Sequence, residues 1–209
     1  MGRKSSYFLE KVNLVLKPAG FRFKKKENAI LFHKGTLFGY NQVYLSTTVQ
    51  DRVLRITPFF YVRVNSVNMF ANPFLGCPEK LYSCNPTIGA NLRNLGLDED
   101  HLVVKTAGDM EASLFIFEDL IESKVVPFFD AFYSAGRLDE ELNRDERPPN
   151  LFLNDIIERP VVGTVAAMLN RNKRFSMLVD YYRHKLLLTT PKIEENYECL
   201  LKCLQIHCQ

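Results

Sequence analysis

Acidic and histidine side chains stand in this chain at spacings that could support proton transfer. Glu118, Asp119 and Glu122 fall within one turn of a helical segment, where paired carboxylates can serve as acid and base. Carboxylates are also common on solvated helix faces, and the helix dipole favours them near an N-terminus. His101 follows three acidic residues, but no nucleophile accompanies it. The sequence lacks nucleophile-elbow, phosphate-loop, dinucleotide and zinc-protease motifs, which argues against those enzyme families. An enzyme of another type would need a pocket that gathers His101 or His184 with acids, and no spacing predicts one, so we expect a protein without catalytic residues.

Cysteine and histidine side chains near the C-terminus raise the question of a metal site. Cys199, Cys203 and His207 recur every four residues on one predicted helix. The first and the last lie about 12 Å apart along the helix axis, which is too far to share one ion. Zinc would need a further ligand from Cys77 or Cys84, whose separation is wider than in usual zinc motifs. We therefore expect free thiols, with no metal and no cofactor.

Aromatic and basic side chains alternate with apolar ones between residues 21 and 64, and this pattern carries the functional prediction. Alternate residues of a strand share one face of the sheet. Tyrosine and arginine on such a face suit a protein partner, and they also suit single-stranded nucleic acid through base stacking and phosphate contacts. A third alternative is that the acidic C-terminal helices of the same chain cover this face. The predicted surface, here called the aromatic–basic face, consists of Arg22, Lys24, Lys26, Tyr40, Tyr44, Arg55, Phe59, Tyr61 and Arg63.

The charge of the chain is unevenly distributed. The 209 residues include 27 Lys and Arg and 24 Asp and Glu, which gives a formal net charge of +3. Residues 1–64 contain twelve basic and three acidic residues, so 15 basic and 21 acidic residues remain for the rest of the chain. Either the two parts attract each other within one fold, or the basic part binds an acidic partner.

A helix and four strands must position the aromatic–basic face. Apolar residues at helical spacing follow Ser5 and Ser6, and Pro18 and Gly20 end this first helix. The pattern then changes to period two, with turns at residues 27–28, 35–39 and 51–52. Short connections make neighbouring strands antiparallel, and the first helix is expected to cover their apolar face. We predict strands over residues 21–26, Ala29–Lys34, Tyr40–Gln50 and Val53–Val64.

The remaining two thirds of the chain are predicted to be irregular over residues 65–100 and mostly helical beyond Met110. Proline and glycine break the segment 65–100, which predicts an irregular excursion with a short helix over Thr87–Leu95. His101–Thr106 is a candidate fifth strand. A central helix follows Met110, with a kink or restart near Pro127. Three further helices are predicted to begin near Pro160, Phe175 and Thr190.

The fold class is therefore α+β, with a four- to five-stranded antiparallel meander packed against helices and a C-terminal helical subdomain. We assign residues 1–147 to the sheet domain with its central helix. Residues 148–209 form the helical subdomain, which is expected to pack on the sheet domain as one globular unit. Asp145–Asn150, with two consecutive prolines, is the predicted linker. Five irregularly spaced cysteines, no export signal and no apolar run of about 20 residues indicate a cytoplasmic protein without a membrane partner.

Two short motifs resemble a known family. Residues 18–25 read PAGFRFKK, and residues 126–132 read VPFFDAF on the predicted central helix. This resembles the bacterial domain-of-unknown-function 4304 family, in which a GF-x-K-K opening and a PFFD helix bracket a small antiparallel sheet. The resemblance implies an immunity or other interaction role, because such families recur beside bacterial toxin genes, and it implies no catalytic residues. The segment 65–100 and the chain after Pro149 depart from the family pattern.

The sequence thus predicts a non-catalytic, cytosolic protein-binding module whose partner has an acidic surface, such as a toxin that it neutralises. The alternative is a single-stranded nucleic-acid-binding protein that uses the same side chains.

Overall fold

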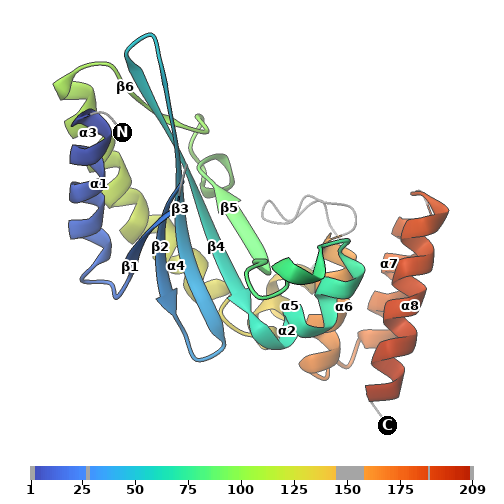
Figure 1. Cartoon of the computed structure of the whole chain (residues 1–209). Coiled ribbons are helices and arrows are strands. Elements are labelled where there is room, and N and C mark those ends of the chain that lie inside the picture. Colours follow the sequence, from blue (N-terminus) through green and yellow to red (C-terminus); the bar gives the residue numbers. More distant parts are fainter. Residues whose placement is uncertain (1–2, 27–28, 145–157, 188, 208–209) are drawn as a thin grey trace. The chain divides into compact units, whose positions relative to one another are not determined.

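The computed structural model describes residues 3–26, 29–144, 158–187 and 189–207 (Figure 1). The chain forms two compact units: Met1–Val62 with Gly89–Asp130, called unit 1, and Arg63–Ile88 with Ala131–Gln209, called unit 2. The predicted boundary between residues 147 and 148 and the predicted linker Asp145–Asn150 lie outside the described residues.

An antiparallel sheet is the centre of unit 1. Its strands run in the order β1-β2-β3-β4-β5, and β6 also pairs with β4. Asp51 and Arg52 have positive φ angles of 51° and 65°, as the two central residues of a tight type I′ hairpin turn require. This turn joins the two longest strands and confirms the predicted link. The strand bounds are Arg22–Lys26 (β1), Ala29–Gly35 (β2), Gly39–Gln50 (β3), Val53–Val64 (β4), Ile88–Asn91 (β5) and Leu102–Val104 (β6).

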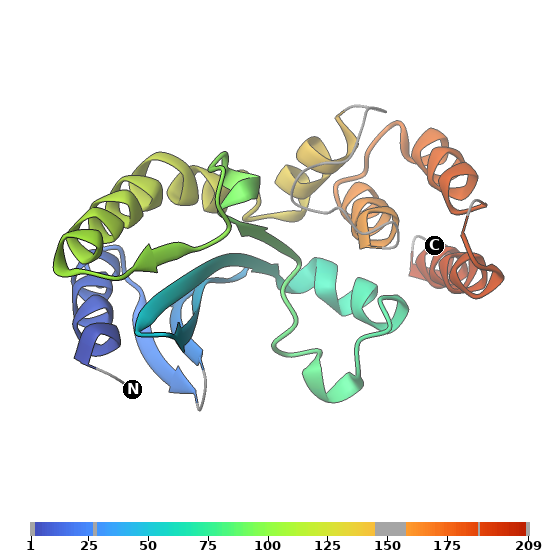
Figure 2. The same cartoon turned by 90° about the horizontal axis from the view of Figure 1, so that it is seen from above.

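Two helices cover the same face of this sheet. Figures 1 and 2 show α1 (Arg3–Leu16) and α3 (Ala107–Leu120) side by side on one side of the strands. The rings of Phe8 and Phe117 meet edge to face between them, with centroids 6.1 Å apart. The sheet contributes fully buried side chains to this core, among them Leu45, Ile56 and Phe60. The first helix therefore covers the apolar face as predicted, together with the central helix.

The central helix contains a π-helical turn just before Pro127. A capping box starts α3, in which Thr106 accepts a hydrogen bond from the Asp109 amide and the Asp109 carboxylate accepts one from the Thr106 amide. A π-helical turn over Ile121–Val125 then leads into α4 (Val126–Ala131). Proline lacks the amide hydrogen that a regular α-helix would use, and the wider π turn accommodates that loss. The break predicted near Pro127 thus takes the form of a π turn before it.

The predicted helix over Thr87–Leu95 is wrong in its first half. Residues Ile88–Asn91 form strand β5, and only Arg93–Leu95 form a 3-10 turn, which Gly96 closes with a φ of 91°. Pairing with the edge of β4 outweighs the weak helical spacing of so short a segment. Strand β6 lies within the predicted strand over His101–Thr106. The α+β class and the antiparallel meander are confirmed.

Unit 2 is helical. The three predicted C-terminal helices are confirmed as α6, α7 and α8. The other segments are α2, two 3-10 turns and α5. Their bounds are Asn65–Ala71 (α2), Asn72–Phe74 and Glu79–Leu81 (the 3-10 turns η1 and η2), Ala135–Asn143 (α5), Glu158–Leu169 (α6), Phe175–Leu186 (α7) and Pro191–His207 (α8).

A buried polar cluster ties α5 to the segments that follow it. The carboxylate of Asp139, whose side chain is 2% exposed, accepts hydrogen bonds from the amides of Asn143 (2.6 Å), Asn170 (2.7 Å) and Asn172 (2.9 Å). Asn143 in turn accepts a hydrogen bond of 2.6 Å from the Tyr182 hydroxyl. Burial raises the pKa of Tyr182 to about 12, so this hydroxyl keeps its proton. We call these five residues the Asp139 cluster.

No helix within the described part of the chain is long and apolar enough to cross a membrane.

Candidate functional site

Strand register brings the N-terminal part of the aromatic–basic face together. Arg22 lies opposite His33, which lies opposite Gln42, and Lys24 lies opposite Leu31 and then Tyr44 in the same way. Residues directly opposite in antiparallel strands share one face of the sheet. Arg22 and Lys24 are exposed and Tyr44 is half-buried. In the strand register Lys26 lies opposite Ala29.

An aromatic band crosses the middle of this face. The ring centroids of Tyr44 on β3 and Phe59 on β4 lie 6.0 Å apart. The rings of Phe59 and Tyr61 are nearly parallel, at 7°, with centroids 6.2 Å apart. A Cβ atom on Gly89 of the adjacent strand β5 would come within 2.7 Å of two carbons of the Tyr61 ring. The absence of a side chain at Gly89 therefore lets Tyr61 lie against the sheet.

Two titratable groups on this face favour their neutral forms. Burial raises the pKa of the Tyr61 phenol, and the nearby Tyr44 adds to this shift. Burial also lowers the pKa of His33 below its ordinary 6.5, and the positive charge of Lys24 lowers it further. The His33 ring lies against that of Tyr40, with centroids 4.8 Å apart. At neutral pH the Tyr61 phenol and the His33 ring are therefore uncharged, and the Tyr61 hydroxyl remains a hydrogen-bond donor.

The arginines of β4 have different surroundings. Arg55 is exposed, and it lies on the same side of β4 as Phe59 because an even number of residues separates them. Arg63 is buried, with only 9% of its side chain exposed. Its guanidinium donates hydrogen bonds to Asn65 Oδ1 (2.8 Å) and to the carbonyl of Asn85 (2.5 Å). Arg63 thus belongs to unit 2, and its charged end is held by protein groups.

Two residues of this surface were not among the predicted ones. The pairing of Lys26 with Ala29 sets the register of β1 and β2, and this register puts His33 opposite Arg22. The sequence could have indicated this position, because the predicted turn at residues 27–28 determines the register of the hairpin. The sequence did not indicate a role for Gly89, because its segment was predicted to be helical. Only strand β5 of the structure shows that Gly89 lies next to the Tyr61 ring.

The other candidate groups lie at the surface. Ligand atoms of Glu99, Asp100 and His101 come within 4.8 Å of one another, and His101 Nδ1 lies 2.5 Å from Asp100 Oδ1. The carboxylates at 118, 119 and 122 are exposed on the central helix. The side chains of Cys84, Cys199 and Cys203 are exposed, and that of Cys77 is partly exposed. Exposed acids and thiols of this kind are ordinary surface features, so the aromatic–basic face is the site that the structure assembles most fully.

Comparison of the chain with protein-family models, with curated proteins and with solved structures gives no match. The resemblance to the domain-of-unknown-function 4304 family stays a prediction. Function is therefore argued from the geometry of the site.

Proposed function

We propose that this protein binds an acidic surface of a partner protein through the aromatic–basic face and catalyses no reaction. The observation that carries the proposal is the packed band of Tyr44, Phe59 and Tyr61 on the central strands, with exposed cations around it. Protein interfaces have this anatomy: a few aromatic anchors lie at the centre, and polar groups form the rim.

The charge of the strands supports an acidic partner. None of the strands β1–β6 in the described part of the chain contains an aspartate or a glutamate. Arg22 and Lys24 lie on β1, at the edge of the sheet, and Arg55 lies near the tip of the β3–β4 hairpin. Cations at the rim of an interface mainly accelerate association and select the partner, and salt weakens their effect.

The proposed mechanism is association that blocks the partner's surface. Cations at the rim attract the partner, and the aromatic band then loses its contact with water. The uncharged Tyr61 hydroxyl donates a hydrogen bond to a carboxylate or a carbonyl of the partner. A cytosolic bacterial toxin neutralised by such blocking is the specific partner class that the family resemblance implies.

Single-stranded nucleic acid is the second candidate, and the aromatic band favours it. Bases stack on exposed aromatic rings of antiparallel sheets, while lysine and arginine contact the phosphates. Two features favour a protein partner instead. The three rings pack against one another in half-buried positions, so they offer one continuous patch rather than separate platforms. In addition, only a few cations surround this patch.

The experiment compares capture by three forms of the protein. The wild type, Tyr61→Ala and Tyr7→Ala are each used to capture proteins from a lysate of the organism that makes the chain. Tyr7 is an exposed tyrosine on α1 and serves as the matched control. A captured protein supports the proposal only if Tyr61→Ala loses it and Tyr7→Ala keeps it. We expect the purified partner to bind Tyr61→Ala about thirty-fold more weakly, because loss of a central aromatic anchor typically costs about 2 kcal/mol.

A titration with a short fluorescein-labelled single-stranded oligonucleotide separates the two candidates. The proposal predicts weak binding that Tyr44→Ala leaves unchanged. Tight binding that falls steeply with salt and is lost in Tyr44→Ala would establish the nucleic-acid function instead. Equal capture of the partner by wild type and Tyr61→Ala would reject this face as the protein interface.

A further inference from the structure

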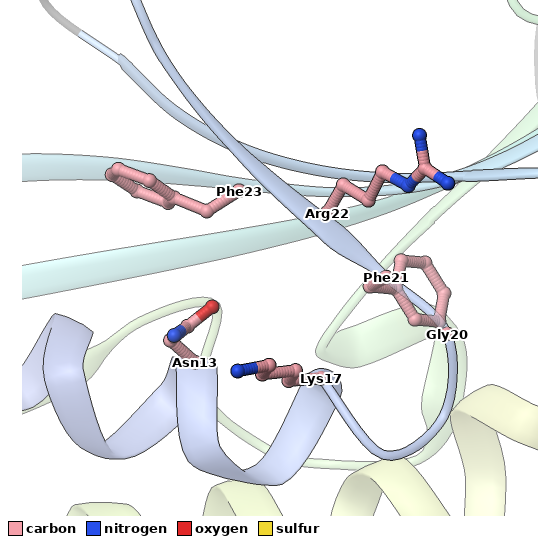
Figure 3. Close-up of a pocket in the computed structure, with 6 residues that line it drawn as sticks. All are labelled: Asn13, Lys17, Gly20, Phe21, Arg22 and Phe23. Atoms are coloured by element: carbon pink, nitrogen blue, oxygen red, sulfur yellow. The ribbon is translucent and has the colours of Figure 1, made fainter.

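A cavity of about 460 Å³ lies between α1 and the edge strand β1, within unit 1. Its lining consists of Asn13, Lys17, Gly20, Phe21, Arg22 and Phe23 (Figure 3). Asn13 and Lys17 lie one helical turn apart on the surface of α1 that faces β1, while the Arg22 side chain extends along the other side of the strand. Arg22 belongs to both the cavity and the aromatic–basic face, but Asn13 and Lys17 lie on the other side of β1 from its side chain.

The end of α1 shapes this cavity. The Gly20 amide donates to the carbonyl of Lys17 (3.0 Å), and the Phe21 amide donates to that of Leu16 (3.2 Å). With Gly20 at a φ of 87°, these bonds form a Schellman motif, which satisfies carbonyls at the C-terminus of the helix. The motif reverses the chain so that Lys17 at the end of α1 and Phe21 before β1 line the same cavity.

Positive charge gathers at the cavity from two elements. Lys17 is exposed at its wall, and none of the lining residues is acidic. Lys34 on β2 lies beside it: its ammonium is 5.8 Å from the centroid of the Phe21 ring, and its side chain passes alongside Gly20. The Asn13 side chain adds an amide that can donate hydrogen bonds. An ammonium group and an amide in the lining, with the Lys34 ammonium near the Phe21 ring, are suited to a phosphate or a carboxylate.

Aromatic surface completes the lining. Phe21 is held in place by the Phe129 ring of α4, with centroids 5.8 Å apart. Phe23 packs on Phe32 at 5.5 Å and still has 46% of its side chain exposed. An open cavity of this volume, with an aromatic wall and a few polar groups, has room for a small molecule. The Phe23 ring offers a surface on which a flat group of the ligand can lie.

We propose that this cavity binds a small organic anion that has a phosphate or carboxylate group next to a flat apolar group. The anion contacts Lys17, Lys34 and the Asn13 amide, and the flat group lies against Phe23. The proposal concerns a second binding site, and it does not depend on the function of the aromatic–basic face.

The test uses phenyl phosphate as the probe, with inorganic phosphate and phenol as its two halves. Binding is followed by NMR through the amide signals of Gly20 and Phe21 in the full-length protein. We expect phenyl phosphate to bind at least about tenfold more tightly than either half, because both parts of the cavity contribute. Benzoate in place of phenyl phosphate distinguishes a carboxylate site from a phosphate site.

Matched lysine variants assign the anion site. Lys17→Gln and Lys34→Gln should each weaken the binding of phenyl phosphate about tenfold, the usual scale for a charge-assisted contact. Lys11→Gln alters a lysine on the same helix, above the ring of Tyr7, and should leave the binding unchanged. Phenol binding as tightly as phenyl phosphate would overturn the anion site. Equal binding of inorganic phosphate would overturn the aromatic part, and equal losses in all three variants would show only non-specific charge attraction.

Discussion

Two regions of this molecule are rich in polar side chains and use them in opposite ways. In the Asp139 cluster of unit 2, amide groups satisfy a carboxylate that is buried, and Asn143 accepts a hydrogen bond from the buried Tyr182 hydroxyl. On the aromatic–basic face of unit 1, exposed cations surround half-buried rings. A buried polar group without a partner costs free energy, whereas an exposed one remains available to a ligand. The comparison suggests that the first region maintains the architecture and the second one binds.

Substitution of Asp139 should have the largest effect, and it tests the structural side of this comparison. Asp139→Ala removes the buried carboxylate that accepts hydrogen bonds from three amides, and leaves the buried Asn143 amide without this acceptor, so we expect the free energy of unfolding to fall by about 3 kcal/mol. The chain contains no tryptophan, so urea unfolding is best followed by far-UV circular dichroism. Binding through the aromatic–basic face should remain intact in the folded fraction.

Glu140→Ala is the matched control for this substitution. Glu140 is the next residue of the same helix, and it forms an exposed ion pair with Arg137 at 2.8 Å. Exposed pairs contribute little, so the urea midpoint should hardly move. If Asp139→Ala left the urea midpoint unchanged and instead abolished partner binding, the Asp139 cluster would not be a structural element distinct from the binding face.

Gly89→Ala tests whether the aromatic–basic face binds the partner, because it adds a single methyl group next to the Tyr61 ring. The new Cβ would lie 2.7 Å from two carbons of the Tyr61 ring, so the ring must leave its place beside Phe59. We expect partner affinity to fall about tenfold and the free energy of unfolding to fall by about 1 kcal/mol, as for moderate overpacking. Titration of the captured partner and urea unfolding measure the two effects separately.

Gly35→Ala provides the control for the added methyl. Gly35 lies on β2, and a Cβ placed there would have no neighbour within 4 Å. This variant should bind and unfold like the wild type. If both alanine variants behaved like the wild type, the position of the Tyr61 ring would not matter for binding.

Much of unit 1 could be predicted from the sequence because its contacts are local. The two-residue link at 51–52 joins two long alternating runs, and alternation alone separates Tyr44, Phe59 and Tyr61 from the core positions Leu45 and Phe60. Each of these inferences depends on residues that are near neighbours in the chain. The aromatic band could be recognised for that reason.

The rest depends on distant partners that no local pattern reveals. Arg63 has the same alternation as Tyr61, but its guanidinium is bound by the carbonyl of residue 85, which lies 22 positions away. Asp139 meets Asn170 and Asn172, which are 31 and 33 residues further along the chain. In β5, the alternate residues Ile88 and Ala90 are buried, as in a strand. The sequence does not reveal this, because the strand forms by pairing with β4, which is distant in the chain. Tertiary contacts therefore decide these positions.

His33→Gln should have the smallest effect, and it refines the electrostatics of the face. The pKa of His33 is lowered in the folded protein by burial and, to a lesser extent, by Lys24, whereas in the unfolded chain it has its ordinary value of 6.5. As the pH falls below about 6.5, the unfolded chain takes up a proton that the folded protein resists, so the wild type loses stability. The stability that the neutral His33 contributes is fully present above about pH 6.5. As the pH falls, this stability declines until the pH reaches the lowered pKa of the folded state.

His33→Gln should therefore reduce the slope of unfolding free energy against pH in the range just below the ordinary pKa of 6.5. Lys24→Gln should reduce it only in part, since burial is the larger cause and remains. Urea midpoints of the three proteins across this pH range measure the slopes. An unchanged slope in His33→Gln would mean that His33 is as accessible to protons in the folded protein as in the unfolded chain. His33 would then take up a proton in mild acid as readily as in the unfolded chain, and the contrast between this neutral ring and the cations beside it would fail.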